Sequence, residues 1–451
     1  MEKELAIELI GGKQFVKLKS ELQEMNPADI AFLVEELNSD GEIGEKELIL
    51  MYRILPKELA AEAFTYMDSD TQITLINAFS DRELRYVLDE LYIDDTVDII
   101  EEMPANVVSR ILRNTDSDTR KQINQLLNYP KDSAGSVMTT EFVYLKKELT
   151  VSEAFEQIRK IGLVKETVYT CYVTENRRLL GIVTVLDMLV ADSDTAVEDI
   201  METNVISVNT HDDREYVART MSKYDFAAIP VVDNENRIVG IVTFDDAMDV
   251  LQEENTEDFA KMAAVVPAED SYFKTSVWSH AKSRIPWLLI LMLSATLTGM
   301  ISASFEPQIA VIPMLVSFMP MVMGTGGNCG SQSSTLIIRG MAIDEIRLRD
   351  FFKVVFKEFR IALICAAVLS VVNSLRVLIT YKDPALALVI GLSLIGTVVI
   401  AKLVGAMLPM GAKALRLDPA IMANPLITTV VDSCSLLIYF TVATNILSGR
   451  L

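Results

Sequence analysis

A polar stripe lies within an otherwise apolar stretch near the end of the sequence. Asn424, Thr428 and Asp432 are spaced four apart, and Asp432 is the only charge between Pro419 and Gly449. On a helix these residues share one face, which then carries an amide, a hydroxyl and a carboxylate. Oxygen ligands suit hard cations such as Mg²⁺ or Ca²⁺ better than Zn²⁺ or Cu²⁺. The stripe therefore predicts a cation site within a membrane span.

The carboxylate of Asp432 needs a partner in such a span. A carboxylate at the centre of a spanning helix costs roughly 2.5 to 3.5 kcal/mol and usually faces water or a partner. If two copies of the helix line a dimer axis, the two carboxylates repel unless one is protonated or a cation lies between them. The alternative is a protonated Asp432 that is hydrogen-bonded between packed helices without any ion.

A second polar feature is GTGGNCGSQSS, residues 324–334. Gly326 and Gly327 allow close backbone approach, while Asn328 and Gln332 lie four apart and face one cavity if the segment is helical. The segment lacks the G-K-[ST] ending of a phosphate loop. It predicts either the lining of a pore or helix packing through small residues, and the two are compatible.

Charge divides the chain into two parts. Residues 273–451 hold 8 of the 63 acidic and 15 of the 41 basic residues, so this part carries about +7 and residues 1–272 about −29. Such an acidic excess argues against a nucleic-acid partner. The N-terminus MEKELAIELI lacks the basic and then apolar pattern of a signal peptide, so we expect the acidic part to be cytoplasmic.

Five predominantly apolar stretches predict an all-α domain with five membrane spans. They cover 285–305, a longer run after it up to Arg339, and roughly 359–380, 385–411 and 421–447. Basic clusters before the first span, between the second and third, and between the fourth and fifth are placed inside by the positive-inside rule. The C-terminus is then outside, and an odd number of spans needs a homodimer to form a two-fold pore.

Three further segments precede this pore domain at 284–451. Residues 1–130 predict an acidic domain of short helices, either a helical repeat superhelix or a generic bundle. Residues 131–252 contain an internal α/β repeat with GIVT at Gly181 and Gly240, and this pair resembles tandem CBS domains. Residues 253–283, broken by Pro267, predict a connecting helix.

The first GIVT motif offers a candidate nucleotide site. In CBS pairs the Thr and Asp that end this motif often hold a ribose, so Thr184 and Asp187 are candidates for binding ATP. Asp187 equally suits a cap on the helix that follows.

The chain as a whole resembles the MgtE family of magnesium channels. The resemblance lies in GTGGNCGSQSSTLIIRG, LVGAMLP at 403–409 and LDPAIMANPLITTVVDSCSLLIYF, set after a helical domain and a CBS pair. It implies a plasma-membrane homodimer for Mg²⁺ uptake, with its pore along the subunit interface and lined by the second and fifth spans. Asp432 matches the selectivity carboxylate of the family, with Asn424 nearby.

The resemblance also implies that cytoplasmic Mg²⁺ binds between the helical domain, the CBS pair and the connecting helix, and shuts the pore. A solvated acidic face explains any one of the matching carboxylates equally well. These carboxylates are Glu62, Asp94, Asp98, Asp213, Glu215, Asp225, Asp246, Asp249, Glu254, Glu257 and Asp258.

Two positions depart from the family pattern. Thr428 stands where an Ala would leave the backbone carbonyl more open, so its hydroxyl either adds a ligand or narrows the path. Lys402 lies within the fourth span, where we expect it to snorkel to the inner interface. If it instead formed a salt bridge with Asp432, a permeation role for that carboxylate would be in doubt.

Other function classes remain open. An ion-coupled divalent-cation carrier would require Asp432 to change protonation during transport. A non-conducting membrane sensor would need the CBS pair but no aqueous path. An enzyme fits least, because the two histidines lie outside any catalytic or metal-ligand spacing and the chain has no Walker motif.

Overall fold

The computed structural model describes residues 3–40, 43–162, 165–267, 272, 275–422 and 424–447. The chain forms two compact units, Met1–Gln252 and Glu253–Leu451, which we describe separately. Their boundary falls within one helix, α15.

The first unit begins with short helices, as the spacing of its apolar residues predicts. At three of them a side chain satisfies free backbone amides: the hydroxyl of Ser80 and the carboxylate of Glu83 form a capping box, and Asp68 and Asp116 cap the starts of their helices. The helices are α1 (Lys3–Gly11), α2 (Phe15–Gln23), α3 (Pro27–Asp40), α4 (Glu45–Arg53), α5 (Lys57–Thr65), α6 (Ser69–Ala78), α7 (Asp81–Glu90), α8 (Ile93–Glu102), α9 (Ala105–Asn114) and α10 (Ser117–Leu126).

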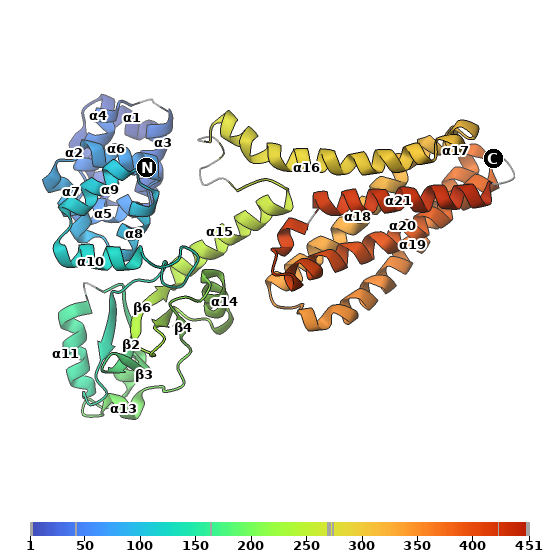
Figure 1. Cartoon of the computed structure of the whole chain (residues 1–451). Helices are drawn as coiled ribbons and strands as arrows, with labels where there is room; N and C mark the ends of the chain where they lie inside the picture. The colour runs from blue at the N-terminus through green and yellow to red at the C-terminus, as the bar shows by residue number, and fades with distance from the viewer. Residues whose placement is uncertain are drawn as a thin grey trace. The chain divides into compact units, whose positions relative to one another are not determined.

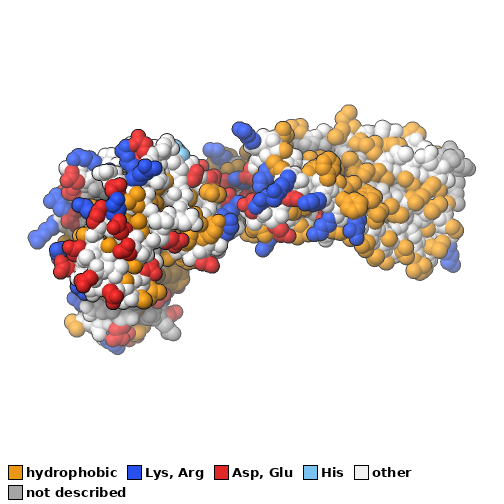
Figure 2. Space-filling view, turned by 90° about the horizontal axis from the view of Figure 1, so that it is seen from below, with side chains coloured by type: hydrophobic (Ala, Val, Ile, Leu, Met, Phe, Trp, Pro, Cys, Tyr) orange, Lys and Arg blue, Asp and Glu red, His pale blue; other side chains and the backbone are white. Residues whose placement is uncertain are grey.

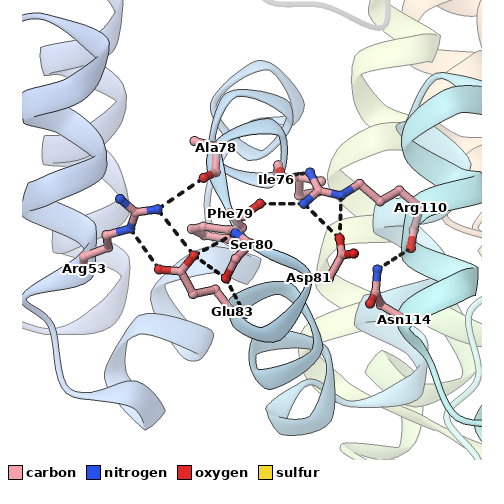
Figure 3. Close-up of polar contacts among 9 residues, drawn as sticks. All are labelled: Arg53, Ile76, Ala78, Phe79, Ser80, Asp81, Glu83, Arg110 and Asn114. Carbon is pink, nitrogen blue, oxygen red and sulfur yellow. Dashed lines mark hydrogen bonds and ion pairs between the residues drawn. The ribbon is translucent and has the colours of Figure 1, made fainter.

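Two arginines hold the turn between α6 and α7 (Figure 3). From α4, Arg53 donates to the carbonyl of Ala78 at 3.2 Å and pairs with Glu83 at 2.9 Å. From α9, Arg110 donates to the carbonyls of Ile76 and Phe79 and pairs with Asp81. The guanidinium groups thereby satisfy carbonyls that the end of α6 leaves without helical partners.

The internal repeat folds as two similar three-stranded sheets. Strand order is β1-β2-β3 in one sheet and β4-β5-β6 in the other, with the first pair parallel and the second antiparallel in both. The elements are β1 (Phe142–Leu145), α11 (Val151–Ile161), β2 (Thr167–Glu175), β3 (Arg178–Thr184), α12 (Val185–Val190), α13 (Val197–Ile200), β4 (Val208–Asn209), α14 (Arg214–Tyr224), β5 (Ala228–Val232), β6 (Ile238–Thr243) and α15 (Phe244–Met262).

The glycines of the two GIVT motifs lie where the repeats exchange backbone contacts. Thr139, which precedes the first sheet, bridges to Ile241 of the second, and Glu202, which precedes the second sheet, bridges to Ile182 of the first. A Cβ on Gly240 would lie 2.7 Å from the carbonyl oxygen of Thr139, and one on Gly181 2.7 Å from that of Glu202. Only glycine admits this approach without displacement.

A single apolar core joins the helical domain to the second sheet. It includes Leu75 and Ile111 from the helices together with Val208, Ile229 and Val242 from the strands, all buried. The first sheet has its own small core around Val143 and Val173. The helical domain and the second repeat therefore pack as one body within the first unit.

Long apolar helices form most of the second unit (Figure 1). By length and hydropathy, four stretches of the described chain are long and apolar enough to cross a membrane, namely Val277–Ser304, Leu348–Tyr381, Pro384–Ala414 and Pro419–Ile446. The helices are α16 (Val277–Ser304), α17 (Glu306–Val311), α18 (Met314–Ala342), η2 (Leu348–Asp350), α19 (Phe351–Tyr381), α20 (Pro384–Ala414), η3 (Pro419–Met422) and α21 (Asn424–Ile446).

The predicted second span corresponds to α18, which is not among these four stretches. This helix has 29 residues, but its middle carries GTGGNCGSQSS, whose polar residues lower its hydropathy. It packs against α20 and α21 over much of its length. The count of five spans stays a prediction.

The connecting helix is shorter than predicted. We expected it over 253–283, but α15 ends at Met262, and the next helix starts only at Val277. Ala264 takes the left-handed conformation (φ 54°), and the amide of Val265 bonds back to the carbonyl of Ala260 at 2.9 Å. This turn is a common helix terminator, and Pro267 follows it. The sequence placed the break at Pro267, a few residues after the observed end, because no glycine marks the turn.

Hydrophobic side chains cover much of the visible surface of the second unit (Figure 2). Leu293, Val371 and Ile379, from α16 and α19, are about two-thirds exposed. Apolar surface on this scale is stable in contact with lipid rather than water. The second unit is therefore built as a membrane domain.

Candidate cation sites

The polar stripe of α21 lies beside the glycine segment of α18. A Cβ on Gly327 would stand 3.2 Å from Thr428 Cγ2 and 4.0 Å from Asp432 Oδ1. Thr428 and Asp432 are half-buried, and the Thr428 hydroxyl donates to the carbonyl of Pro425 at 2.9 Å. The two polar segments found in the sequence are therefore brought together, with the carboxylate of Asp432 and the methyl group of Thr428 at their contact. Asn424 begins α21, and its side chain lies outside the described residues.

The remaining residues of the glycine segment divide between packing and exposure. A Cβ on Gly326 would lie 2.7 Å from both Ser435 Oγ and Thr397 Cγ2, so this glycine allows α18 to touch α20 and α21. Asn328 and Gln332 are exposed in the single chain. Gly326 thus has the packing role predicted for the segment, and the pore-lining role of Asn328 and Gln332 stays a prediction.

The position and the partners of Lys402 differ from those predicted from the sequence. Lys402 neither snorkels to the interface nor pairs with Asp432: it is 5% exposed, its Nζ donates to Ser333 Oγ at 3.2 Å and lies 4.0 Å from Glu358 Oε2. The prediction of snorkelling is wrong because Glu358, on α19, supplies a buried counter-charge. Glu358 was overlooked because only the tertiary fold brings α19 beside Lys402. The charge of Lys402 is therefore balanced away from the polar stripe.

A second group of oxygen ligands lies in the first unit, where α8 meets the CBS pair. Burial and the charge of Asp95 raise the pKa of Asp94 to about 7, and burial and the charge of Asp94 raise that of Asp246 to about 7. One carboxylate oxygen of Asp94 is buried without a hydrogen-bond partner. Asp98 belongs to the same cluster, where burial among its neighbours and the charge of Asp246 raise its pKa to about 8. Part of its side chain is still in contact with solvent, which weakens its interaction with the other carboxylates.

Three further carboxylates of this acidic cluster were missed in the sequence. Asp95 has its pKa raised to about 6 and Glu166 to about 9, both by burial and then by neighbouring carboxylates, while burial raises the pKa of Glu141. The pattern IDDTVD could have revealed Asp95, which directly follows Asp94. Glu141 and Glu166 come from the first CBS copy, and no local signal links them to α8.

Two predicted residues lie near the same cluster. Burial raises the pKa of Tyr66, and the charges of Glu62, Asp245, Asp95 and Asp249 raise it further. Glu62 and Asp249 therefore approach one phenol ring from the helical domain and from α15. The structure thus brings together five of the predicted carboxylates: Glu62, Asp94, Asp98, Asp246 and Asp249.

Three other predicted carboxylates have local structural roles around α14. Asp213 caps the start of this helix by accepting from the amides of Glu215 and Tyr216. Glu215 pairs with Arg219 one turn later, and Asp225 ends the helix in the left-handed conformation.

The last three predicted carboxylates, Glu254, Glu257 and Asp258, lie on the end of α15 in the second unit. Lys261 Nζ is 2.7 Å from both Glu257 Oε1 and Asp418 Oδ2. Asp418 directly precedes η3, which leads to α21. One ammonium therefore ties the end of α15 to the segment that leads into the polar stripe.

The candidate nucleotide residues form a helix cap. Thr184 Oγ accepts from the amide of Asp187 at 3.1 Å, and Asp187 Oδ2 accepts from the amide and the hydroxyl of Thr184. This reciprocal arrangement is a capping box at the start of α12. The structure therefore shows the helix cap that the sequence offered as an alternative to a nucleotide site.

Among the described residues, no three His, Cys, Asp or Glu side chains are arranged to hold one metal ion directly. Mg²⁺ gives up its water reluctantly and often binds through a hydrated shell with one or two carboxylates. The acidic cluster and the polar stripe suit such a hydrated ion better than a tightly ligated one.

Family models match most of the chain. A divalent cation transporter domain matches residues 319–442, the MgtE intracellular N domain matches 25–132, and two CBS domains match 134–194 and 197–253. The magnesium transporter MgtE of Thermus thermophilus is 38% identical over the full length of both chains. The chain belongs to the MgtE family of magnesium transporters. It is therefore a multi-pass membrane protein from a family of transporters rather than of enzymes.

The chain is also similar to a second relative and to two solved structures. The magnesium transporter MgtE of Bacillus subtilis is 33% identical over 94% of this chain and 93% of its own. A crystal structure of the soluble part of a magnesium transporter is 29% identical, with a TM-score of 0.51 over 56% of this chain and 97% of that chain. A structure of the cytosolic domain of the Mg²⁺ channel MgtE in complex with ATP is 35% identical, with a TM-score of 0.48 over 51% of this chain and 93% of that one.

Proposed function

We propose that this MgtE-family protein is a Mg²⁺-selective channel of the plasma membrane, which mediates magnesium uptake and is shut by cytoplasmic Mg²⁺. The observation that carries the channel proposal is the contact of Gly327 with Thr428 and Asp432. It joins a carboxylate and a backbone free of side chain at one place in a membrane domain. Such a surface accommodates a hydrated divalent cation without a chemical step.

The pore forms between two copies of the chain in this proposal. Asn328 and Gln332 are exposed on α18 next to Gly327, so the polar surface is open on one side in the single chain. A second copy related by a two-fold axis would place α18 and α21 of both chains around a common path. Five spans with cytoplasmic acidic domains then leave the C-terminus outside.

The gate is proposed to depend on the acidic cluster. Its buried carboxylates favour a bound proton or cation, because ionised groups this close repel each other. When cytoplasmic Mg²⁺ is high, bound ions neutralise the cluster and keep the cytoplasmic domains compact. When Mg²⁺ falls, repulsion loosens them and the pore opens. The proposed domains are a helical domain at 1–130, the CBS pair at 131–252, a connecting segment at 253–283 and a pore domain at 284–451.

Mg²⁺ flux into liposomes that hold the purified protein tests the channel. We expect Asp432→Ala and Asp432→Asn to lose flux or Mg²⁺ selectivity, and Glu345→Gln, at an exposed carboxylate of the same unit, to behave as wild type. Unchanged flux in both Asp432 variants would make Asp432 a packing residue. Stoichiometric proton or sodium counter-flux would identify a carrier, and a wild type without flux would favour a sensor.

The gate is tested on the same liposomes by raising Mg²⁺ on the cytoplasmic face. Wild type should lose flux at high Mg²⁺, whereas Asp94→Asn and Asp246→Asn should need a different Mg²⁺ concentration for closure. Glu156→Gln, at an exposed position of α11, is the matched control. Equal closure in all variants would disprove the assignment of these carboxylates to the gate.

ATP is proposed as a second ligand of the first unit, at Thr184 and Asp187. A ribose hydroxyl could replace the hydrogen bonds that these residues make with each other. Equilibrium dialysis with ATP should show binding that Asp187→Ala reduces. Equal binding in wild type and variant would leave these residues as a helix cap alone.

A further inference from the structure

Three buried polar side chains from three helices meet in the second unit. The hydroxyl of Ser333 on α18 donates to Glu358 Oε2 on α19 at 2.6 Å and accepts from Lys402 Nζ on α20 at 3.2 Å. The ammonium and the carboxylate are 4.0 Å apart. Glu358 and Lys402 are 6% and 5% exposed, and Ser333 is fully buried. We call these three residues the charged triad.

The charged triad has no net charge, because the carboxylate of Glu358 balances the ammonium of Lys402. A buried charge within a membrane domain is costly unless a partner compensates for it. Lys402 carries the same sign as the transported ion, so without Glu358 it would add a positive charge to the interior of the transport domain. In a low-dielectric interior such a charge acts over a longer distance than it would in water.

Two helices of the charged triad, α18 and α20, meet α21 at residues adjacent in sequence to the polar stripe. Ala401, next to Lys402, has its carbonyl 3.2 Å from the position of a Cβ on Gly330, and Ile427 Cγ2 and Val431 Cγ2 lie 2.8 and 3.3 Å from the same position. Ile427 and Val431 immediately precede Thr428 and Asp432.

We propose that Glu358 is a charge-compensating residue of the transport domain: it cancels the charge of Lys402, so that a divalent cation is not repelled from the face formed by α18 and α21. Ser333 connects the two charges and holds them to α18. This inference rests on the proposed transport path along that face.

The decisive comparison is between Lys402→Arg and the double variant Glu358→Gln with Lys402→Arg. Arginine stays protonated in proteins, so the double variant has a fixed positive charge without its carboxylate. We expect Lys402→Arg alone to keep Mg²⁺ flux within about threefold of wild type, because its charge pair is intact. The double variant should lose at least about tenfold in flux, because a doubly charged ion is repelled by the uncompensated charge.

Neutral variants separate charge from packing. Glu358→Gln with Lys402→Gln removes both charges and should recover flux to within about threefold of wild type. Lys402→Gln leaves only the carboxylate and should lower the Mg²⁺ concentration that gives half-maximal flux. A merely structural role would instead reduce maximal flux in both variants and leave that concentration unchanged. If the variants with Lys402→Arg do not fold, these two variants still test the inference.

A solvent-accessible pair of the same unit, with an exposed lysine and a partly exposed aspartate, provides the matched control. Lys353 Nζ lies 2.9 Å from Asp350 Oδ1 near the start of α19. Asp350→Asn with Lys353→Arg makes the same change of charge, but in contact with water, and should leave flux unchanged. If flux falls equally in this control and in the Glu358 variant, the inference is wrong.

Two outcomes distinguish this inference from the proposed function. If wild type conducts Mg²⁺ and the variant with Glu358→Gln and Lys402→Arg conducts equally well, the inference is overturned and the transport path stands. If wild type carries no Mg²⁺, the proposed function fails and the inference fails with it.

Discussion

At the scale of single residues, the glycines of α18 determine how closely the membrane helices approach. Gly326 and Gly324 lie two residues apart, yet a Cβ on Gly326 would meet Ser435, Thr397 and Val431 at 2.7 to 2.9 Å, whereas one on Gly324 would meet nothing within 4 Å. The two glycines therefore offer a matched pair of substitutions in one helix.

Gly326→Ala should destabilise the membrane domain by about 1–3 kcal/mol, because the methyl group forces apart three packed side chains. Gly324→Ala should be neutral or stabilising by up to about 1 kcal/mol, because alanine favours a helix more than glycine does. Thermal unfolding of the full chain in detergent measures both. A Gly326→Ala midpoint equal to that of Gly324→Ala would contradict the close packing described here.

At the scale of elements, the two CBS copies depend on exchanged backbone contacts. The amide of Thr139 donates to the carbonyl of Ile241 at 2.8 Å, and the amide of Ile241 donates back at 2.9 Å. Gly240 lies beside this bridge, with no room for a side chain. We expect Gly240→Ala to break the bridge and to destabilise the second sheet by about 1–3 kcal/mol.

Urea unfolding of a fragment of residues 1–252, which holds its own cores, measures this effect. Gly11→Ala is the control, since a Cβ there meets nothing within 4 Å. Equal unfolding midpoints for the two variants would show that the bridge contributes little to stability.

Local patterns predicted the elements better than their ends and partners. The four-residue spacing of Thr428 and Asp432 correctly predicted a shared helical face, and the repeated GIVT predicted two similar sheets. The end of α15 was missed because Ala264, not a glycine, takes the left-handed turn. Glu358 and Glu166 were missed because their partners lie on distant segments, and spacing along one helix carries no information about such contacts.

At the scale of the whole molecule, the acidic cluster makes the stability of the first unit depend on pH. In the folded state the pKa values of Asp94, Asp246 and Glu166 are raised to about 7, 7 and 9, above those of unfolded carboxylates. Their protonated forms favour the fold, so this contribution is fully present below about pH 4 and is lost as pH rises toward 9. Without divalent cations, the free energy of unfolding of the 1–252 fragment should fall over this range.

Two controls belong to this measurement. Asp246→Asn should flatten the fall in stability around pH 7, because it removes one of the titrating groups. Adding Mg²⁺ at pH 8 should restore stability in wild type, because a bound cation replaces the missing protons. A pH profile that is the same in wild type and Asp246→Asn would exclude this carboxylate as a source of the effect.

The same protonation predicts how pH acts on transport. Protons that neutralise the acidic cluster remove the repulsion that opens the proposed gate, so cytoplasmic acidification from pH 8 to pH 6 should lower Mg²⁺ flux even when cytoplasmic Mg²⁺ is low. Asp94→Asn and Asp246→Asn should weaken this response, because each removes a group whose pKa of about 7 lies in that interval. Glu156→Gln should keep the full response.

Changing the pH only on the opposite face of the liposome membrane separates the gate from the polar stripe, since protonation of Asp432 from that side would lower flux in all variants equally. If cytoplasmic acid lowers flux to the same degree in wild type and in both Asn variants, the acidic cluster does not control the gate.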